Sequence, residues 1–569
     1  MNNRSAFHTL LFLCFLGWMA GFIWVPIMDI DASQYASISR EMLERKSFLE
    51  VYDVGKDYLD KPPLLFWFSA LSMWIFGPTQ WAFRLPSLLF AMLAVVSTYQ
   101  IARLYYNQQV ARLSALVLAS SQALFLITHD VRCDTMLMGW VSLSIWQLAL
   151  WYRRGNISFL IIAAFAIAGG MLTKGPIALL VPAFAFAPHF ILQRNWKPFF
   201  QKEYLLVIVI IAICLIPMSI GLYRQFDLQP GKLINGIPIQ SGLRFYFWTQ
   251  SFGRYTGENF FHEMSYFSFL FENMLWSFLP WILIFSAALI ERVYQLIRQK
   301  GKIGGEQEWL TAGGFIITYL VLSRSQYQLP HYIFVVFPLA AVVTGQFLFQ
   351  LQHHEKYHRF SRYFNWFHLL LFTLLWVVLN ILLWWVFPDT SNILSWWIFP
   401  KAGWVKILAI LAIPILWIGI SKKFDRVPLL IRLAVFTSVG INIFLSTTFY
   451  PQVLKYQMGN DAADFINQQQ LPKDKMVVLG PDAGRSLYFY SRYIFPSTHQ
   501  VGQIGAKQFV ITVKDSIPVV MRAYPGTTIL HEGYNYGVSM LTPEFLNPAT
   551  REGACGKYAI LRLPEGKRP

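Results

Sequence analysis

The chain has 569 residues, of which 55% are hydrophobic, 17% aromatic and only 14% charged. Soluble globular proteins carry about 25% charged residues, far more than this chain. The composition excludes a disordered chain, a collagen, a coiled coil and a disulfide-rich secreted domain, and it indicates a polytopic membrane protein. Lys and Arg outnumber Asp and Glu by 47 to 30, a net charge of +17. Basic cytoplasmic loops explain this excess without a nucleic-acid partner.

Apolar stretches long enough to cross about 30 Å of hydrocarbon predict thirteen membrane spans. They lie at 9–28, 84–104, 110–129, 134–152, 157–172, 176–193, 204–222, 268–290, 309–323, 331–350, 363–387, 403–420 and 429–448. We therefore expect an α-helical transmembrane domain over residues 1–449.

The loops between these spans predict the orientation. Every second loop is short and basic, as at Arg153 and Arg154 or at Lys422 and Lys423, whereas the opposite loops carry few cations. Because Lys and Arg concentrate in cytoplasmic loops, we expect a cytoplasmic N-terminus and a periplasmic C-terminal region. The short apolar segment 62–77 would invert this pattern if it crossed, so it is predicted to lie along the outer membrane surface.

Three segments are large enough to fold outside the membrane. Two are outer loops at 29–83 and 223–267, and the third is the C-terminal region 450–569. That last region has short apolar runs typical of strands, alternating with helical or turn segments. These runs are 476–480, 486–490, 508–513, 527–532 and 558–563. They predict a small α/β domain.

The first polar cluster follows the first span. Asp29 and Asp31 precede a short predicted helix with one apolar face, as expected of a helix at the membrane interface. That face is formed by Tyr35, Ile38, Met42 and Leu43. Asp31 is either an N-cap of this helix or a functional acid at the outer surface.

The second cluster surrounds the start of the segment 62–77. Tyr58, Asp60 and Lys61 precede a proline, and Arg84 lies where the next span begins. Lys61 is either half of a surface ion pair with Asp60 or a ligand for a phosphate group. Arg84 is either a further substrate ligand or a side chain that reaches from the span to the interface.

The third cluster returns to the same predicted outer face. Asp130 and Asp134 flank Arg132 between two spans, and Lys174 lies in a later outer turn. Asp134 is either a helix cap or a partner of Asp31, because two acids at one face suit general-base chemistry. Lys174 is either a feature of the turn or a ligand.

The later outer loops contribute three more candidates. Arg254 and His262 lie in the second outer loop, and Tyr332 lies before the span 331–350. His262 is either a metal ligand together with Asp60 or a simple loop histidine, since no regular metal-ligand spacing accompanies it.

Five motifs together resemble a known family. They are D-x-D-x-x-x-Y-A-x-I-S-R-E-M-L from Asp29, Y-x-D-K-P-P from Tyr58, F-R-L-P-S from Phe83, R-C-D-T-M-L from Arg132 and T-K-G-P from Thr173. The chain is similar to the C-type glycosyltransferases that use polyprenyl-phosphate sugars. The nearest branch contains the bacterial lipid A 4-amino-4-deoxy-L-arabinose transferase and relatives of the protein O-mannosyltransferases.

This resemblance implies roles for individual residues. Asp31 matches the family's essential acid of the first outer loop, Asp134 matches its second acid, and Asp130 is a neighbour of the second. These three are the expected catalytic residues. The expected substrate-binding residues are Asp29, Tyr35, Tyr58, Lys61, Arg84, Lys174, Arg254 and Tyr332, with Lys61 on the lipid phosphate.

The resemblance also implies a reaction. A sugar would pass with inversion from undecaprenyl phosphate to lipid A, a surface glycan or a protein at the outer face of the bacterial inner membrane. No nucleotide motif is present, and the only implied cofactor is zinc, on Asp60 and His262. The alternative is a flippase or transporter of lipid-linked sugars without catalysis.

The chain departs from that branch at two motifs. Ala32 and Gln34 stand where the branch carries Glu and Arg, and Gln328 stands where it carries Lys. The sugar and the acceptor therefore stay open at this point.

Overall fold

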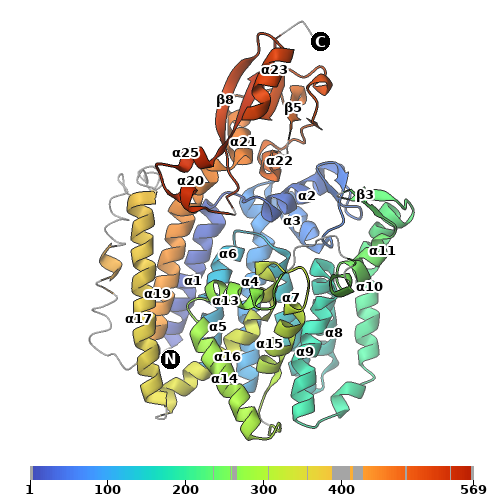
Figure 1. Ribbon diagram of the computed structural model, residues 1–569. Helices are drawn as coiled ribbons and strands as arrows, with labels where there is room; N and C mark the ends of the chain where they lie inside the picture. Colours follow the sequence, from blue (N-terminus) through green and yellow to red (C-terminus); the bar gives the residue numbers. More distant parts are fainter. Residues whose placement is uncertain are drawn as a thin grey trace.

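The computed structural model describes residues 4–234, 236–256, 258, 265–304, 307–354, 357–386, 410–413, 415, 427–480, 483–538 and 540–564. A bundle of long helices carries a smaller α/β domain at one end (Figure 1). The N-terminus lies near the other end of the bundle, so the bundle separates the two termini.

Long apolar helices form the bundle because these segments combine bulky apolar residues with almost no interior charge. They are α1 (Arg4–Trp24), α4 (Gln80–Tyr105), α7 (Cys133–Arg154), α8 (Ile157–Lys174), α9 (Ile177–Leu192), α10 (Tyr204–Leu222), α15 (Leu310–Ser323), α16 (Phe337–His353), α17 (His358–Ile381) and α19 (Val427–Phe444). Among the described residues, seven helical stretches are long and apolar enough to cross a membrane.

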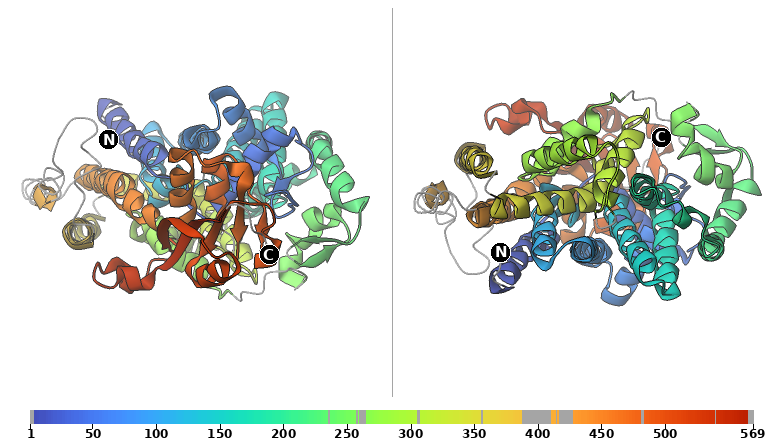
Figure 2. Two further views of the ribbon diagram at one scale, coloured as in Figure 1. Left: turned by 90° about the horizontal axis from the view of Figure 1, so that it is seen from above. Right: turned by 90° about the horizontal axis from the view of Figure 1, so that it is seen from below.

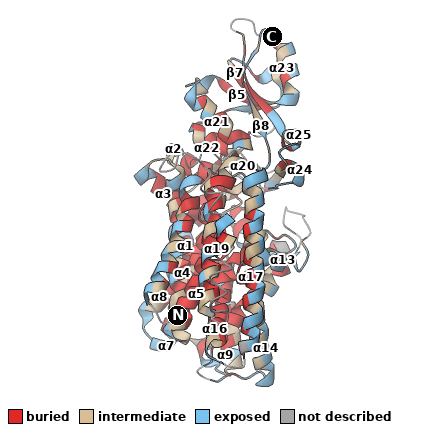
Figure 3. Ribbon diagram, turned by 90° about the vertical axis from the view of Figure 1, so that its left-hand side faces the viewer, coloured by how far each residue is buried: buried red, intermediate tan, exposed pale blue. Residues whose placement is uncertain are grey.

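Polar residues set the ends of several bundle helices. The side chain of Thr79 accepts a hydrogen bond from the Ala82 N–H at the start of α4, and Asn156 caps α8 in the same way. Gly155 adopts φ +70 at the end of α7, a conformation that favours glycine. The bundle interior is mostly buried, whereas outward faces such as that of α17 are exposed (Figure 3), as expected of helices that face lipid.

Two of the predicted spans are interrupted. The span 110–129 divides into α5 (Gln108–Ala119) and α6 (Gln122–Ile127), and the span 268–290 divides into α13 (Phe269–Ser277) and α14 (Ile282–Arg298). Pro280 cannot continue a helix. The two breaks meet, because Gln122 N–H donates to Leu279 O at 3.0 Å and Trp281 Nε1 donates to Ser120 Oγ at 2.9 Å. Groups freed by one break thus find partners in the other.

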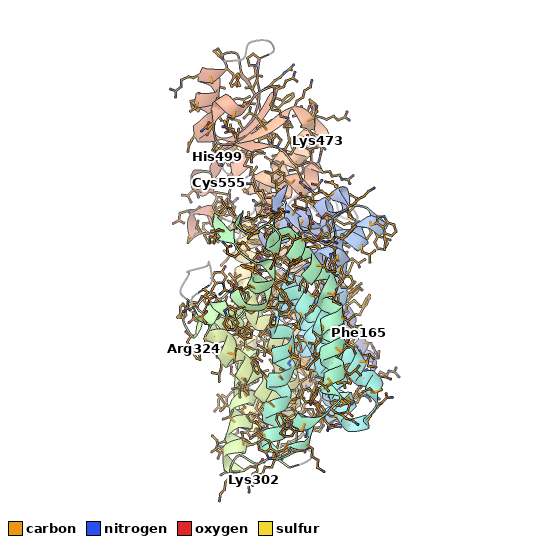
Figure 4. The ribbon with its side chains drawn as sticks, turned by 90° about the vertical axis from the view of Figure 1, so that its right-hand side faces the viewer. Phe165, Lys302, Arg324, Lys473, His499 and Cys555 are labelled. Carbon is orange, nitrogen blue, oxygen red and sulfur yellow. The ribbon has the colours of Figure 1, made fainter. Side chains whose placement is uncertain are left out.

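The predicted span 403–420 lies almost wholly outside the described residues. Each of the other twelve predicted spans overlaps helical structure. The total number of crossings stays a prediction. The basic loop around Lys302 lies at the end of the bundle far from the domain that carries Lys473 and His499 (Figure 4).

Two short helices lie across the end of the bundle beneath the α/β domain (Figure 1). The helix α2 (Asp31–Arg45) buries Tyr35, Ile38 and Met42, which belong to the predicted apolar face. The helix α3 (Leu64–Phe76) falls within the predicted surface segment and exposes Trp74 by 73%. Such an exposed aromatic residue is typical of the membrane interface.

The C-terminal region contains a five-stranded sheet. Its strands are β5 (Met476–Leu479), β6 (Ser497–Thr498), β7 (Phe509–Val513), β8 (Thr528–Asn535) and β9 (Gly556–Arg562), in the spatial order β6-β5-β7-β9-β8. β5 pairs in parallel with β6 and β7, whereas β9 is antiparallel to β7 and β8. Seen from above, this domain covers part of the bundle end (Figure 2).

One predicted strand is wrong. The run 486–490 forms the helix α22 (Arg485–Ser491), which buries Leu487 and Phe489. A short run in which four of five residues are apolar or aromatic fits either a strand or a helix. Here the packing of these side chains decides for the helix. α22 lies against α2 and against α21 (Met458–Gln468), so a helix buries these side chains between two other helices.

Candidate functional site

Arg132 joins two acids that lie about one hundred residues apart. Its guanidinium donates to the Asp31 carboxylate and to Asp130 Oδ2, the latter at 2.9 Å and 3.0 Å. Burial raises the pKa of Asp130 and the nearby Asp31 charge adds to this, whereas Arg132 opposes it. The first and third polar clusters of the sequence therefore meet at one end of the bundle.

Neither predicted catalytic acid acts as a helix cap. The N-cap of α2 is Ile30 and that of α7 is Arg132, so Asp31 and Asp134 lie inside the first turns. Asp31 and Asp134 therefore form ion pairs instead of capping the helices. Acids in a first turn are favoured by the helix dipole, which lowers the cost of holding two carboxylates so near each other.

Asp134 is held by two cationic or titratable side chains. Lys174 Nζ donates to its Oδ1, and His331 Nε2 lies 3.5 Å from its Oδ2. The Asp134 side chain is only 3% exposed. The same Lys174 ammonium lies 3.9 Å from the centre of the Tyr332 ring, a cation–π contact. The C-terminal end of α8 and the 3₁₀ segment Pro330–Val336 therefore meet at Asp134.

Lys61 and Asp60 form another ion pair. A residue of the loop 223–267 forms a hydrogen bond to it. Lys61 Nζ lies 2.7 Å from Asp60 Oδ2, and Gln250 Nε2 donates to Asp60 Oδ1 at 2.9 Å. Burial lowers the pKa of Lys61, but the Asp60 charge, the hydrogen bond to Asp60 and the nearby Tyr332 and Cys133 groups together outweigh burial, so the pKa is raised and the ammonium stays charged. Gln250 ties the two outer loops together at this point.

A cavity of about 300 Å³ opens beside these groups. Its polar lining includes Lys61, Lys174, Gln250, Ser325 and Tyr332. Its apolar walls are formed by Leu137, Ile177, Leu180, Phe184, Val321, Leu322 and Val335. Two ammonium groups at an apolar cavity suit an amphipathic anion, because the charges bind a head group while the walls bind a hydrocarbon chain.

The two acid clusters and both lysines form one continuous network. Cys133, which lies between Arg132 and Asp134, experiences the charges of Lys61, Lys174, Asp60 and Asp134. Tyr35 experiences those of Asp31 and Asp60. The structure therefore brings together residues from each of the three predicted clusters at the end of the bundle nearest the α/β domain.

Two predicted site residues, Arg84 and Asp29, do not line the cavity that holds the two lysines. Arg84 is fully buried, and its guanidinium donates to the carbonyls of Phe22, Pro26 and His129 at 2.9–3.1 Å. It thus holds backbone segments together, which favours a structural role over the predicted substrate-binding one. Asp29 faces the α/β domain, where it accepts hydrogen bonds from Ser486.

The two predicted tyrosines of the first outer loop are buried. The rings of Tyr35 and Tyr58 lie 5.7 Å and 5.8 Å from that of Phe66. Burial and the Asp60 charge raise the pKa of Tyr58 well above its usual value, so its hydroxyl stays protonated. The Arg254 side chain and His262 lie outside the part of the chain that the structure describes in such detail.

The predicted zinc site stays a prediction, because His262 lies outside the described residues. The described residues contain no group of three His, Cys, Asp or Glu side chains that could hold a metal ion. Both carboxylate oxygens of Asp60 are already engaged, one by the Lys61 ammonium and one by Gln250. A cation next to an ammonium group is repelled, so we assign no chemical step to a metal.

The structure adds three residues to those predicted, namely Arg132, Gln250 and His331. Arg132 had a signal in the sequence, because it lies between two acids at a helix start. Gln250 and His331 had no local signal, since each reaches a carboxylate from a distant loop.

Comparisons with known proteins agree with this architecture. Residues 60–220 match the family described as dolichyl-phosphate-mannose-protein mannosyltransferase. The undecaprenyl phosphate-α-4-amino-4-deoxy-L-arabinose arabinosyl transferases of Edwardsiella ictaluri and Pseudomonas paraeruginosa are 26% identical over 57% and 62% of this chain. These matches span 55% and 61% of the length of the two relatives.

Two solved structures share the fold over nearly the whole chain. ArnT from Cupriavidus metallidurans bound to undecaprenyl phosphate superimposes with a TM-score of 0.74 at 15% identity, covering 100% of both chains. The apo form gives 0.72 and covers 97% of both. The predicted resemblance to the C-type polyprenyl-phosphate-sugar glycosyltransferases is confirmed, and the chain has their fold. It is a multi-pass membrane protein.

Proposed function

We propose that this chain is a membrane glycosyltransferase. It takes a sugar from undecaprenyl phosphate and transfers it with inversion to lipid A, a surface glycan or a protein. One observation carries the proposal: two lysines, Lys61 and Lys174, line an apolar cavity of about 300 Å³ directly beside a cluster of carboxylates. The names of the similar transferases support transfer over the alternative of a flippase.

A lipid phosphate can replace the carboxylate that holds each lysine. Lys61 is held by Asp60 and Lys174 by Asp134, and both ammonium groups line the cavity. A prenyl phosphate with its chain along the apolar walls places its head group between them. Each ammonium can then turn from its carboxylate to the phosphate, which neutralises the charge that develops on the leaving group.

Asp31 is the proposed general base. Its carboxylate is 30% exposed, which leaves room for an approaching hydroxyl group, and Arg132 fixes its position. The acceptor oxygen attacks the anomeric carbon of the donor from the face opposite the phosphate. The bond from carbon to phosphate oxygen breaks, undecaprenyl phosphate leaves with the electron pair, and the hydroxyl proton passes to Asp31.

The proposed orientation places this chemistry at the outer face of the bacterial inner membrane. The N-terminus is then cytoplasmic and the domain from residue 450 onward is periplasmic. A cysteine introduced at His499 should react with a membrane-impermeant reagent in intact spheroplasts, whereas one at Lys302 should react only after lysis. The reverse pattern would contradict the orientation.

The experiment that tests the function is a mass analysis of lipid A, surface glycans and envelope glycoproteins from cells with and without the protein. We expect a sugar on one of these acceptors only when the protein is present. The Asp31→Asn variant should abolish it, whereas Asp474→Asn, at an exposed acid of the outer domain, should retain it. If the Asp31→Asn variant still added the sugar to the acceptor in full, Asp31 would not be the general base.

A further inference from the structure

A second cavity, of about 320 Å³, lies where the α/β domain meets the first outer loop. Its floor is the turn that precedes and begins α2, with Asp29, Ile30 and Ser33. Its other walls come from Gln457, from the segment 483–485 and from the segment 535–538. It shares no lining residue with the cavity that holds the two lysines.

Gln457 clamps the floor of this cavity to the α/β domain. Its Oε1 accepts from Asp29 N–H at 2.9 Å, and its Nε2 donates to Ile27 O at 3.1 Å and to Ser486 Oγ at 3.0 Å. The side chain is 3% exposed. Buried amide hydrogen bonds of this kind are costly to break, so the floor and the opposite wall keep a fixed separation.

The remaining walls are fixed as well. Gly484 has φ +84, and a Cβ there would lie 2.5 Å from Asp29 Oδ2, so only glycine permits this close approach. Arg485 is held by Asp53 at 3.1 Å. Tyr536 N–H donates to Tyr456 O at 2.9 Å, and its ring stacks on Phe545 with the ring centres 4.0 Å apart. The cavity is therefore a built feature of the junction.

The lining offers both donors and acceptors and little net charge. Asp29 and Arg485, of opposite charge, line the same space as Asn535 and Ser33. Polyhydroxylated molecules are recognised by such mixed polar groups in a pocket between domains. Asp31 does not line the cavity itself, but it directly follows the lining residue Ile30 at the start of α2.

We propose that this cavity binds the saccharide part of the acceptor and presents one of its hydroxyl groups to Asp31. The donor lipid then occupies the cavity with the two lysines, and the acceptor approaches from the side of the α/β domain. This inference rests on the proposed transferase function. It gives the α/β domain a role in acceptor recognition.

The test fills the cavity without disturbing its walls. A Cβ at Gly537 would have no heavy atom within 4 Å, and the φ of this residue is not in the left-handed region, so Gly537→Trp should fold normally and occupy the space. Gly502 has the same open surroundings but does not line the cavity, so Gly502→Trp is the matched control. Asn535→Ala removes one polar group without adding bulk.

The measurement is the affinity of the purified full-length protein for lipid A, with undecaprenyl phosphate as the second probe. We expect Gly537→Trp to raise the Kd for lipid A about tenfold or more and Asn535→Ala to raise it a few-fold, in line with the usual value of pocket contacts. Gly502→Trp should match the wild type, and none of the three should change the Kd for undecaprenyl phosphate.

The two proposals can fail separately. Equal lipid A affinity of Gly537→Trp and the wild type, or no lipid A binding by the wild type, would overturn the acceptor site while leaving the donor site intact. Absence of undecaprenyl phosphate binding by the wild type would instead overturn the proposed function.

Discussion

Two clusters of buried ionic groups lie at opposite ends of the same bundle, and they differ in their surroundings. At the end away from the α/β domain, Glu308 accepts from Tyr106, from Arg292 at 3.3 Å, and from Thr311 N–H and Oγ1 at 2.9 Å and 2.7 Å. Its side chain is 1% exposed. The cluster of Asp31, Asp134 and the two lysines has fewer internal partners for each charge and adjoins a cavity.

The difference shows that buried ion pairs alone do not indicate function. The Glu308 cluster satisfies its charges internally and holds the ends of α4, α14 and α15 together. The outer cluster binds its lysines to single carboxylates, so an incoming anion can compete for them. Substitutions in the two clusters should therefore have opposite consequences, for stability in one and for activity in the other.

The largest effect should come from Asp134→Asn. The substitution removes the charge that holds Lys174, so the ammonium no longer has a fixed position beside the leaving phosphate. We expect the rate of sugar transfer to fall about 100-fold or more, with a smaller fall in the melting temperature than Glu308→Gln causes, because the freed Lys174 ammonium lines the cavity and can meet water there. A normal rate, measured with purified protein, would place Asp134 outside the catalytic machinery.

Next in size is the effect of Glu308→Gln on stability. Removing one partner of a buried ion pair costs about 3–5 kcal/mol, so the melting temperature should fall clearly while the Kd for undecaprenyl phosphate stays constant. Arg292 and hydrogen bonds outweigh burial and lower the pKa of Glu308. Its stabilisation is thus present above pH 4.5 and is lost as the pH falls through the lowered pKa, a loss that Glu308→Gln should lack.

Lys61→Met should weaken donor binding. A charge-assisted hydrogen bond contributes about 1.5–3 kcal/mol, so the Kd for undecaprenyl phosphate should rise about 10–100-fold. Lys302→Met, at an exposed lysine of the opposite end, is the matched control and should leave the Kd unchanged. Equal effects of the two variants would indicate only a general attraction of the basic protein for an anionic lipid.

Gln250→Leu should change the Kd for undecaprenyl phosphate less than Lys61→Met does. The substitution removes the hydrogen bond that Gln250 donates to the Asp60 carboxylate and leaves Asp60 to Lys61 alone. The ammonium is then held more firmly by its carboxylate, so we expect the Kd for undecaprenyl phosphate to rise about 2–10-fold. A lowered Kd would mean that Gln250 blocks the cavity.

The smallest effect should come from Asp29→Asn. Burial raises the pKa of Asp29 above its usual 3.8 despite hydrogen bonds from Ser33 and Ser486. The stability that this acid contributes is present below pH 3.8 and is lost as the pH rises through its raised pKa. The amide of the Asp29→Asn variant does not ionise, so the variant does not lose this stability as the pH rises. It should melt slightly higher than the wild type at neutral pH, and the difference should vanish near pH 3.8.

Much of this arrangement could be predicted from the sequence, for a physical reason. Counting spans places Asp31, Lys61, Asp134 and Lys174 at one membrane face, because each crossing reverses the chain, and the structure brings all four together. The same counting cannot supply Gln250 or His331, whose contacts depend on how loops fold over each other. Nor could it separate Arg84, a cation that binds backbone carbonyls, from one that faces a ligand.

Errors in secondary structure have the same origin. The helix α22 and the breaks at Ser120 and Pro280 depend on partners far along the chain. A short aromatic run becomes helical because α2 and α21 cover it, and two helices can break inside the bundle because each supplies the hydrogen bonds that the other loses.

The Gln457 clamp also bears on the order of synthesis. The groups that fix the backbone before Asp31 come from residues 457 and 486, so they leave the ribosome only after more than three quarters of the polypeptide. Until then the turn that carries the proposed base lacks these hydrogen bonds. On the proposed function and orientation, we expect a nascent or prematurely ended chain to insert into the membrane yet to transfer no sugar until its last domain has been exported and has docked.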